Sequence, residues 1–148
     1  MNSLEIANIL KSNSLTAKCF KGVYSANNIP YFNEIPHGIV VNTDKLGEPG
    51  THWVAIYVKD KNSVEYFDSF AQPPNKFIEN YLKKFQYLKI NKTRIQSIFD
   101  TSCGSHVIYF LFHSCIGRPF DSIVKILNDP FSDSFVKLFV YNLIYKKQ

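Results

Sequence analysis

The sequence has few of the features that fix a protein's class by themselves. Its three cysteines, Cys19, Cys103 and Cys115, are an odd number without paired spacing. Such a set is a poor disulfide framework, and it predicts free thiols in a reducing compartment, with Cys19 and Cys115 as structural thiols. The first residues have no basic start followed by a long apolar run, so no secretory signal is expected. The longest apolar stretch, around residues 107–112, is too short to span a bilayer, and we expect a protein inside cells and away from membranes.

Charge of one sign is only modestly in excess. The chain of 148 residues is 45% hydrophobic and 20% charged, which is typical of one globular domain, here residues 1–148. Its net charge is +5, and the scattered lysines fit a solvated surface as well as a polyanionic partner. One basic cluster is a candidate nucleic-acid contact: Lys83, Lys84, Lys89, Lys92 and Arg94. The aromatic residues among these side chains are also explained as the buried face of an amphipathic helix.

Apolar periodicity predicts an α+β fold with a mixed central β-sheet flanked by helices. Helices are expected over residues 3–11 (capped by Ser3), 75–88, 104–115, 123–129 and 135–147. Strands are expected over residues 38–42, 52–60, 63–70 and 91–100, with a turn at 43–51 and an extended loop at 20–36. The strands at 52–60 and 63–70 are close enough in the chain to pair as antiparallel neighbours.

Cys103 stands where a largely apolar helix is expected to begin. Asp100, Thr101 and Ser102 are good cap residues directly before it, and Gly104 after it would let a substrate backbone come close. The unpaired N–H groups of a helix start lower the pKa of a thiol and favour the reactive thiolate. The alternative is a small buried thiol that opens a core helix.

Three other residues supply what a nucleophilic thiol needs. His52 begins one predicted strand and Asp68 closes the neighbouring one, so antiparallel pairing would bring an imidazole and a carboxylate to the same end of the sheet. Gln96, seven residues before Cys103, could donate to an oxyanion together with the backbone N–H of Cys103. Taken singly, Asp68 could merely cap a turn and Gln96 could be a polar strand residue.

The remaining histidines give no metal signature. His106 follows Cys103 by three residues, but no second Cys/His pair stands at ligand spacing, and no metal is expected. We expect His106 to border the cleft, His113 to be a satisfied polar residue at the helix end, and His37 to lie in a loop.

The order His, Asp, Gln, Cys resembles the adenovirus-type maturation proteases (adenain) and the related ubiquitin-like-protein proteases. The likeness extends to IVVNTDKLGEPGTHWVAIYV before and after the histidine, to YFDSF around the acid, and to IQSIFDTSCGSHVIYFLFH with its glutamine-to-cysteine spacing. The upstream FKGVYSANNIP is similar to an N-terminal stretch of the family, so the resemblance covers about residues 15–115.

This resemblance implies a protease fold with the nucleophile at the N-terminus of a buried helix. It assigns a catalytic set, Cys103 as nucleophile, His52 as base, Asp68 as orienting acid and Gln96 as oxyanion donor, and a substrate cleft at Trp53, Gly104 and Ser102. It implies a monomeric viral endopeptidase that cleaves capsid or other structural precursors near small residues such as glycine. No cofactor is required, although DNA or a peptide could activate the enzyme. The place of action would be the virion or the host-cell interior, in cytoplasm, viral factory or nucleus.

Three departures from the family pattern matter. The acid is Asp, as in the ubiquitin-like-protein proteases, whereas adenovirus enzymes have Glu. The stretch between Asp68 and Cys103 is shorter and has no cysteine, so activation by a disulfide-linked peptide cannot be transferred. The short chain is closer to the compact proteases of virophages and Polinton/Maverick transposons. Two alternatives stay open: a deubiquitinase or deSUMOylase with the same chemistry, and a non-enzymatic nucleic-acid-binding module with a coincidental triad.

Overall fold

A computed structural model describes residues 1–44, 52–97 and 100–146. The elements, in chain order, are α1 (Ser3–Ser12), β1 (Phe20–Ser25), β2 (His37–Asn42), β3 (Trp53–Val58), β4 (Ser63–Phe67), α2 (Lys76–Leu82), β5 (Tyr87–Ile90), α3 (Cys103–Cys115), α4 (Phe120–Leu127) and α5 (Ser132–Tyr145). Within the described ranges, no helix is long and apolar enough to cross a membrane.

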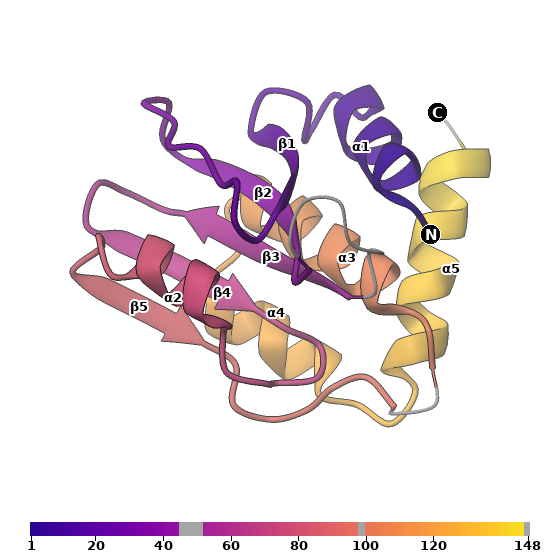
Figure 1. The fold of residues 1–148 in the computed structure, drawn as a ribbon. Helices are drawn as coiled ribbons and strands as arrows, with labels where there is room; N and C mark the ends of the chain where they lie inside the picture. The colour runs from indigo at the N-terminus through magenta and orange to yellow at the C-terminus, as the bar shows by residue number, and fades with distance from the viewer. Residues whose placement is uncertain (45–51, 98–99, 147–148) are drawn as a thin grey trace.

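The strands form one mixed sheet in the order β1-β2-β3-β4-β5 (Figure 1). The pairs β2–β3 and β3–β4 are antiparallel, whereas β1 lies parallel to β2 and β5 parallel to β4. The expected antiparallel pairing of the two central strands is therefore present, with Ala55 opposite Phe67. This arrangement confirms the predicted α+β class with a mixed central sheet.

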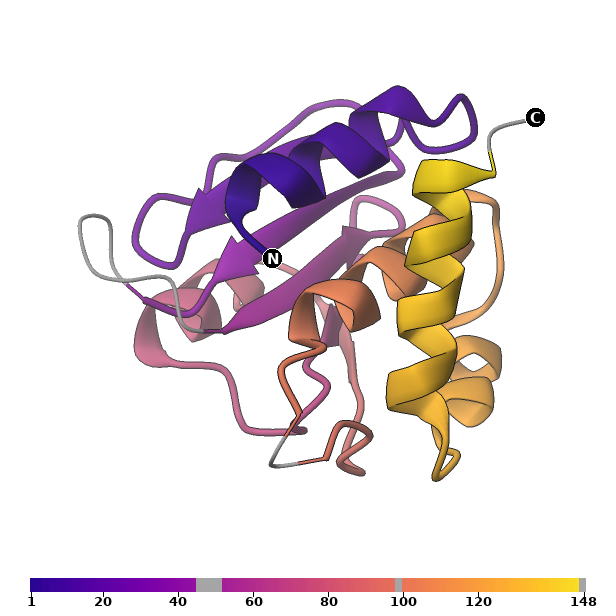
Figure 2. The same cartoon turned by 90° about the vertical axis from the view of Figure 1, so that its right-hand side faces the viewer.

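The two faces of the sheet are covered unequally. Along β3 the side chains of Trp53, Ala55 and Tyr57 belong to the core shared with α1, α3, α4 and α5, whereas Val54 and Ile56 belong to the core on the α2 side. Because successive strand residues point to opposite faces, a continuous apolar run serves both cores. Figures 1 and 2 show α3 between the sheet and α5, with α2 on the other face of the sheet.

Helix α3 is the most deeply buried helix, which fixes the position of Cys103 at its first residue. Residues 107–111 are all buried, and the ring of Phe110 stacks on Phe67 of β4 with centroids 4.7 Å apart. A Cβ at Gly38 of β2 would lie 2.7 Å from Leu111 Cδ2, so the Leu111 side chain occupies the space that the glycine leaves open. These contacts hold α3 against the sheet.

The predicted helix over 75–88 is too long. Helix α2 ends at Leu82, and Tyr87–Ile90 form β5 instead, paired with Ser63–Tyr66. The apolar spacing extends beyond the end of α2 because Phe85, which follows the helix, also packs against the α2-side core. The backbone N–H and C=O groups at the edge of β4 need hydrogen-bond partners. Pairing with them makes residues 87–90 a strand, although their local sequence pattern is ambiguous.

The predicted strand over 91–100 is wrong within the described residues 91–97 and 100, which are irregular. Their backbone bonds to the end of β4 rather than to a ladder, since the N–H groups of Ile95 and Gln96 both donate to the carbonyl of Ser69, at 2.8 and 2.9 Å. Residues 98 and 99 lie outside the described part of the chain, as do residues 45–51 of the predicted turn.

Three smaller predictions are also corrected. The cap of α1 is Asn2 rather than Ser3, because the Asn2 side chain accepts the N–H of Glu5 at 2.9 Å. The expected loop over 20–36 begins with the strand β1. His37 is the first residue of β2, fully buried, and not a loop residue.

Cys19 and Cys115 are not free thiols. They form a disulfide with a Cα–Cα distance of 5.9 Å, across a sequence separation of 96 residues. The bridge joins the residue before β1 to the last residue of α3, which no local spacing could foretell. Cys103 is the free cysteine of the three.

Glu65 of β4 is a buried carboxyl that should destabilise the fold above neutral pH. It is 6% exposed, and its Oε1 is buried with no hydrogen-bond partner among the described residues. Burial, opposed by Lys59 and Lys89, raises its pKa from 4.5 to about 7. The folded state therefore binds the proton more tightly, so this contribution to stability is full below pH 4.5 and is lost as pH rises through about 7.

Replacing Glu65 with Gln removes this titration. We expect the free energy of unfolding of Glu65→Gln, relative to wild type, to rise by about 1–3 kcal/mol between pH 5 and pH 8. Urea unfolding of both proteins at the two pH values measures this difference. An unchanged difference would mean that the Glu65 carboxyl is as well solvated in the folded state as in the unfolded chain.

Candidate active site

The antiparallel pairing of β3 and β4 brings an imidazole and a carboxylate together. His52 directly precedes β3 and Asp68 directly follows β4, so both lie at the same end of this strand pair (Figure 1). His52 Nε2 lies 2.6 Å from Asp68 Oδ1, and both side chains are largely buried. Such a contact fixes the orientation of the ring and stabilises its protonated form.

Asp68 is itself held on several sides. Its Oδ1 accepts the N–H of Phe70 at 2.9 Å, and the Phe70 ring packs against the His52 ring with centroids 4.8 Å apart. The side chain of Asn91 bonds the Asp68 backbone twice, accepting its N–H at 3.0 Å and donating to its carbonyl at 2.7 Å. Phe70 and Asn91 are not among the residues that the sequence pattern predicts for this site. Only the position of Phe70, two residues after the acid, could have suggested its role.

Cys103 is the first residue of α3, and its thiol meets His52 at the sheet end. Burial acts to raise the pKa of Cys103, but the nearby His52 ring with its charge and the backbone N–H groups of Trp53 and Gly104 outweigh it and lower the pKa below its ordinary value of 9.0. A lowered pKa increases the thiolate fraction near neutral pH. The helix start contributes as expected through its backbone, since Gly104 N–H is one of these donors.

The predicted capping is different in detail. Ser102 is the N-cap residue of α3, yet its side chain makes no capping bond to the helix backbone. Its hydroxyl donates instead to Asp133 Oδ1, at 3.2 Å. Ser102 is buried and does not line the pocket beside Cys103.

His52 carries the complementary shift. Burial acts to lower the pKa of His52, but the bonds and charges of Asp68 and Cys103 outweigh it and raise the pKa to about 9. Nε2 faces Asp68, while Nδ1 is buried and has no hydrogen bond of normal geometry among the described residues. Since Nε2 is taken by Asp68, Nδ1 is the nitrogen left to accept the thiol proton. Its bond to the thiol need not be formed in the free protein, because catalytic contacts of this kind often tighten only when substrate binds.

Gln96 lies in the irregular segment after Asn91 and is 1% exposed. Its Oε1 accepts the Ser69 hydroxyl at 2.6 Å, and its Nε2 donates to the Asp100 carbonyl at 2.7 Å. These two bonds fix the amide and leave its second N–H for another acceptor.

A pocket of about 310 Å³ brings most of the predicted site residues together. Its lining includes Cys103, His52, Gln96, Trp53, Gly104 and Met1. The indole Nε1 of Trp53 donates to the Met1 carbonyl at 3.2 Å. A Cβ at Gly104 would lie 3.3 Å from the Met1 Cβ, so glycine leaves room for the chain's first residue as well as for a ligand. Asp68 lies behind the ring and lines a neighbouring pocket that His52 and Phe70 share.

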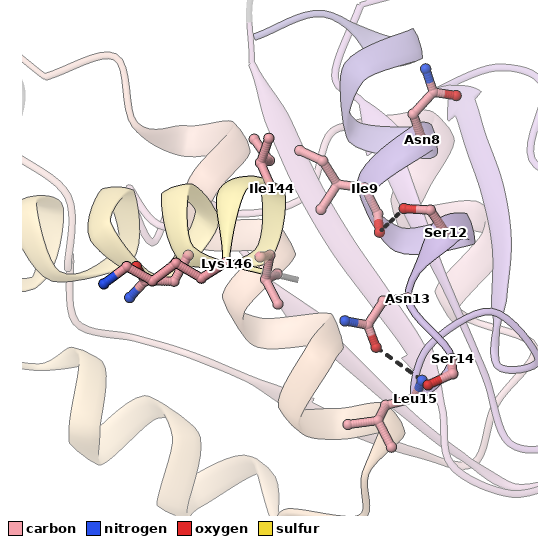
Figure 3. Close-up of a pocket in the computed structure, with 10 residues that line it drawn as sticks. Asn8, Ile9, Ser12, Asn13, Ser14, Leu15, Ile144 and Lys146 are labelled. Carbon is pink, nitrogen blue, oxygen red and sulfur yellow. Dashed lines mark hydrogen bonds between the residues drawn. The ribbon is translucent and has the colours of Figure 1, made fainter. Parts of the chain in front are cut away.

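A larger pocket, about 730 Å³, lies between the ends of α1 and α5 (Figure 3). Asparagine, serine, aliphatic side chains and Lys146 line it, and none of its described lining residues is a histidine, cysteine or carboxylate. It lacks the groups for acid–base or nucleophilic chemistry, so size alone does not identify the active site here.

The other histidines do not join the pocket. His106 was expected to border the cleft, but it is fully buried and its Nε2 lies 2.8 Å from Asp133 Oδ1. His113 is bonded through Nδ1 to the Tyr109 carbonyl at 2.8 Å, as a satisfied residue near the helix end. Across residues 1–44, 52–97 and 100–146, no group of three His, Cys, Asp or Glu side chains could hold a metal ion.

The predicted basic cluster is divided between surfaces. Lys83 pairs with Glu79 of α2, and the Lys84 ammonium lies over the Tyr31 ring. Lys89 instead pairs with Asp121 of α4, whose helix packs on the opposite face of the sheet from α2. Two further cations of the cluster, Lys92 and Arg94, are exposed beyond β5. A nucleic-acid contact through all five side chains remains a prediction.

Some known proteins resemble this chain in sequence, and others resemble it in structure. No protein-family model matches the chain. A candidate thiol protease of Acanthamoeba polyphaga mimivirus is 34% identical over 114 residues, which cover 66% of this chain and 38% of that protein. The cysteine protease of African swine fever virus is 33% identical over 87 residues, which cover 50% of this chain and 32% of that protein. The chain thus spans about a third of the length of the curated relatives that it matches.

Solved structures extend the likeness to nearly the whole fold. The crystal structure of the African swine fever virus protease has a TM-score of 0.70 and 17% identity, over 96% of this chain and 66% of that chain. The central domain of an uncharacterised Legionella pneumophila protein has a TM-score of 0.58 and 13% identity, over 97% of both chains. The chain is thus similar in sequence to viral thiol proteases and has the α+β fold of the African swine fever virus enzyme.

Proposed function

We propose that the chain is a cysteine endopeptidase in which Cys103 is the nucleophile, His52 the acid and base, and Asp68 the orienting carboxylate. The observation that carries the proposal is the buried imidazole between a carboxylate at 2.6 Å and a thiol of lowered pKa. The names of the viral relatives support the same reaction class.

The proposed reaction has two stages, acylation of Cys103 and hydrolysis of the thioester. The Cys103 thiolate attacks the scissile carbonyl carbon, and the new C–S bond leaves the negative charge on oxygen. As the C–N bond breaks, the His52 imidazolium gives its proton to the leaving amine. Water then attacks the thioester while neutral His52 takes its proton, and cleavage of the C–S bond restores the thiolate and releases a carboxylic acid.

Gln96 and the backbone N–H of Cys103 are the proposed oxyanion donors. Gln96 is preorganised by Ser69 and the Asp100 carbonyl, so it need not reorganise when charge develops. A Gln96→Glu variant keeps the size of the side chain but replaces the amide donor with a carboxyl. We expect kcat to fall about 10²-fold or more with KM changed much less.

Alkylation of Cys103 by iodoacetamide provides the control for Gln96→Glu, because this reaction forms no tetrahedral oxyanion at a scissile carbonyl. Its rate should stay within about threefold of wild type, as expected when the nucleophile and its base are intact. If alkylation slows as much as hydrolysis, Gln96 acts on the thiol rather than on the oxyanion.

The proposed substrates are capsid or other structural precursors of a virus, cut near small residues such as glycine. The viral origin of both curated relatives supports this substrate class. The walls that Trp53, Phe70 and Met1 form around a pocket of about 310 Å³ favour a slender chain over bulky side chains beside the nucleophile.

Substrate profiling tests this proposal. Wild-type protein is incubated with a peptide library, with structural precursors of viruses that encode similar proteases, and with ubiquitin-like proteins carrying a C-terminal Gly-Gly extension, and products are read by mass spectrometry. Cleavage of peptides and precursors next to small residues is expected. Selective processing of the ubiquitin-like proteins would replace the precursor assignment, and no cleavage of any substrate by a fully alkylatable protein would contradict the peptidase assignment.

A further inference from the structure

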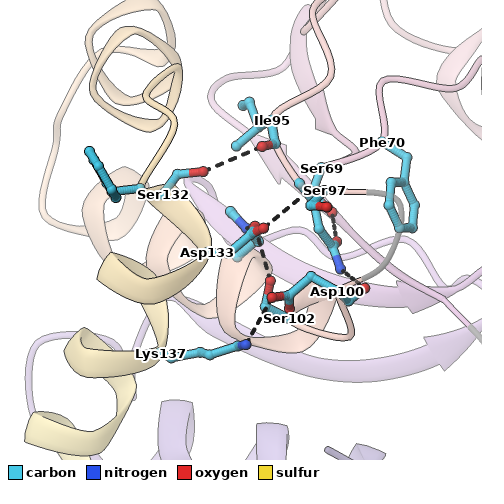
Figure 4. Close-up of polar contacts among 12 residues, drawn as sticks. Ser69, Phe70, Ile95, Ser97, Asp100, Ser102, Ser132, Asp133 and Lys137 are labelled. Atoms are coloured by element: carbon cyan, nitrogen blue, oxygen red, sulfur yellow. Dashed lines mark hydrogen bonds and ion pairs between the residues drawn. The ribbon is translucent and has the colours of Figure 1, made fainter.

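The first two turns of α5 contact the segment that leads from Gln96 to Cys103 (Figure 4). The centre of this contact is Asp133. Its Oδ2 accepts the backbone N–H of Ser97 at 3.1 Å, and its Oδ1 accepts the Ser102 hydroxyl at 3.2 Å. Oδ1 also lies 2.8 Å from His106 Nε2. One carboxylate therefore bonds three separate points of the chain.

The three points bracket the proposed catalytic machinery. Ser97 directly follows the oxyanion donor Gln96, Ser102 directly precedes the nucleophile Cys103, and His106 lies one turn further along α3. A shift of Ser97 relative to Ser102 would change the distance between the amide that holds the oxyanion and the sulfur that attacks. Misplacement of reacting groups by about 1 Å costs about 10²-fold in rate.

The contact is directional, and it is buried at His106 but exposed at the Ser97 N–H. His106 is fully buried, and the Asp133 side chain is 17% exposed. Burial lowers the pKa of His106 in spite of Asp133, so at neutral pH the ring is neutral and donates its Nε2–H. The carboxylate is thus held by three neutral donors in fixed directions, rather than by a diffuse attraction between charges.

Two neighbouring contacts act on the same segment. Lys137, one turn after Asp133 on α5, bonds Asp100 Oδ2 at 2.9 Å with its Nζ. The Ser132 hydroxyl donates to the Ile95 carbonyl at 3.4 Å. Both are weaker than the Asp133 contact, since the Lys137 side chain is 51% exposed and the bond of the buried Ser132 is long.

We propose that Asp133 is a positioning residue, which ties Ser97, Ser102 and His106 together and so keeps Gln96 and Cys103 at their working separation. The proposal rests on the proposed peptidase function. According to this proposal, the rate of acyl transfer also depends on Asp133 of α5, which is not one of the four proposed catalytic residues.

The test compares Asp133→Asn with wild type by three measurements. Asn keeps the size of the side chain but has a single acceptor oxygen, and with that oxygen toward Ser102 and His106 the Ser97 N–H faces an NH₂ group and loses its acceptor. We expect kcat for peptide hydrolysis to fall about 10- to 100-fold, per alkylatable Cys103, with KM within about threefold. Iodoacetamide alkylation of Cys103 should stay within about threefold, because His52 and Asp68 are untouched. Hydrogen exchange at the Ser97 amide should accelerate at least about tenfold as its acceptor is lost.

Asp121→Asn is the matched control. Asp121 stands at a similar place in the first turn of α4, but its carboxylate makes a surface pair with Lys89, and all three measurements should equal wild type. Ser102→Ala removes a single one of the three bonds and should lower kcat less, about threefold, which keeps the test open if Asp133→Asn folds poorly.

The outcomes separate this proposal from the one on which it rests. Wild-type kcat in a folded Asp133→Asn protein, or unchanged exchange at Ser97, would overturn the positioning role. Equal losses in hydrolysis and alkylation would make Asp133 a general determinant of the fold instead. If wild type cleaves nothing, the peptidase assignment fails, while exchange at Ser97 still decides whether Asp133 holds this segment.

Discussion

A Cys103→Ala protein is expected to fold as wild type does and to lose peptide hydrolysis by at least about 10⁴-fold. Loss of the attacking atom removes the covalent route altogether, and positioning by the cleft cannot replace it. The fold should tolerate the change, because the thiol is only half-buried and Ala leaves a small gap. Steady-state hydrolysis of the best library peptide and thermal unfolding measure the two effects.

Cys103→Ser and labelling of the wild type complete the first experiment. Serine keeps the shape but has a hydroxyl too weakly acidic for its base, so it should be as inactive as alanine. Since Cys19 and Cys115 are joined in a disulfide, iodoacetamide without reductant should add one label to wild type and none to either variant. Hydrolysis that survives in both variants would show another nucleophile or a contaminating protease.

A His52→Ala protein should lose hydrolysis by a similar factor and should also lose the reactivity of Cys103 near neutral pH. Without His52, burial remains as the largest influence on the thiol, and it raises the pKa instead of lowering it. The thiolate is then a minor species at pH 7. We expect iodoacetamide alkylation at pH 7 to slow by about 10- to 100-fold.

The pH profile of alkylation shows whether His52 lowers or raises the pKa of Cys103. In wild type the thiolate–imidazolium pair exists from the lowered pKa of Cys103 up to the raised pKa of His52, about 9, so the rate should already be high at pH 7. In His52→Ala the rate should rise only as pH passes the ordinary thiol value of 9.0. His113→Gln, which changes a histidine at the far end of α3, should follow the wild-type curve. Superimposable wild-type and His52→Ala curves would remove His52 from the proposed mechanism.

Sequence patterns foretold the parts of this site that depend on neighbouring strands and on one helix. Two β-type runs separated by a short turn predict an antiparallel pair, and such a pair places His52 and Asp68 at one end. The apolar run after Cys103 predicts a buried helix that has Cys103 at its start. These inferences need only local periodicity and the geometry of one pairing.

Other parts depend on contacts between distant residues, which periodicity does not encode. Asp133 and His106 are 27 residues apart in the chain, and nothing in the spacing of α5 marks its first acidic residue as a partner of the nucleophile loop. The segment 91–97 has an alternating pattern yet satisfies its backbone at the Ser69 carbonyl. Residues 87 and 88, the end of the predicted helix, belong instead to a strand at the sheet edge, because tertiary hydrogen bonds outweigh a weak local preference.

The contact between the Trp53 indole and the Met1 carbonyl has a practical consequence for every experiment above. Met1 lines the pocket that holds Cys103, so any residue joined to its amino side would start at the rim of that pocket. An affinity tag or fusion partner placed there would compete with peptides for access and would lower the measured rate for a purely steric reason. Lys146 at the other end borders the separate pocket between α1 and α5, so a purification handle belongs on that end.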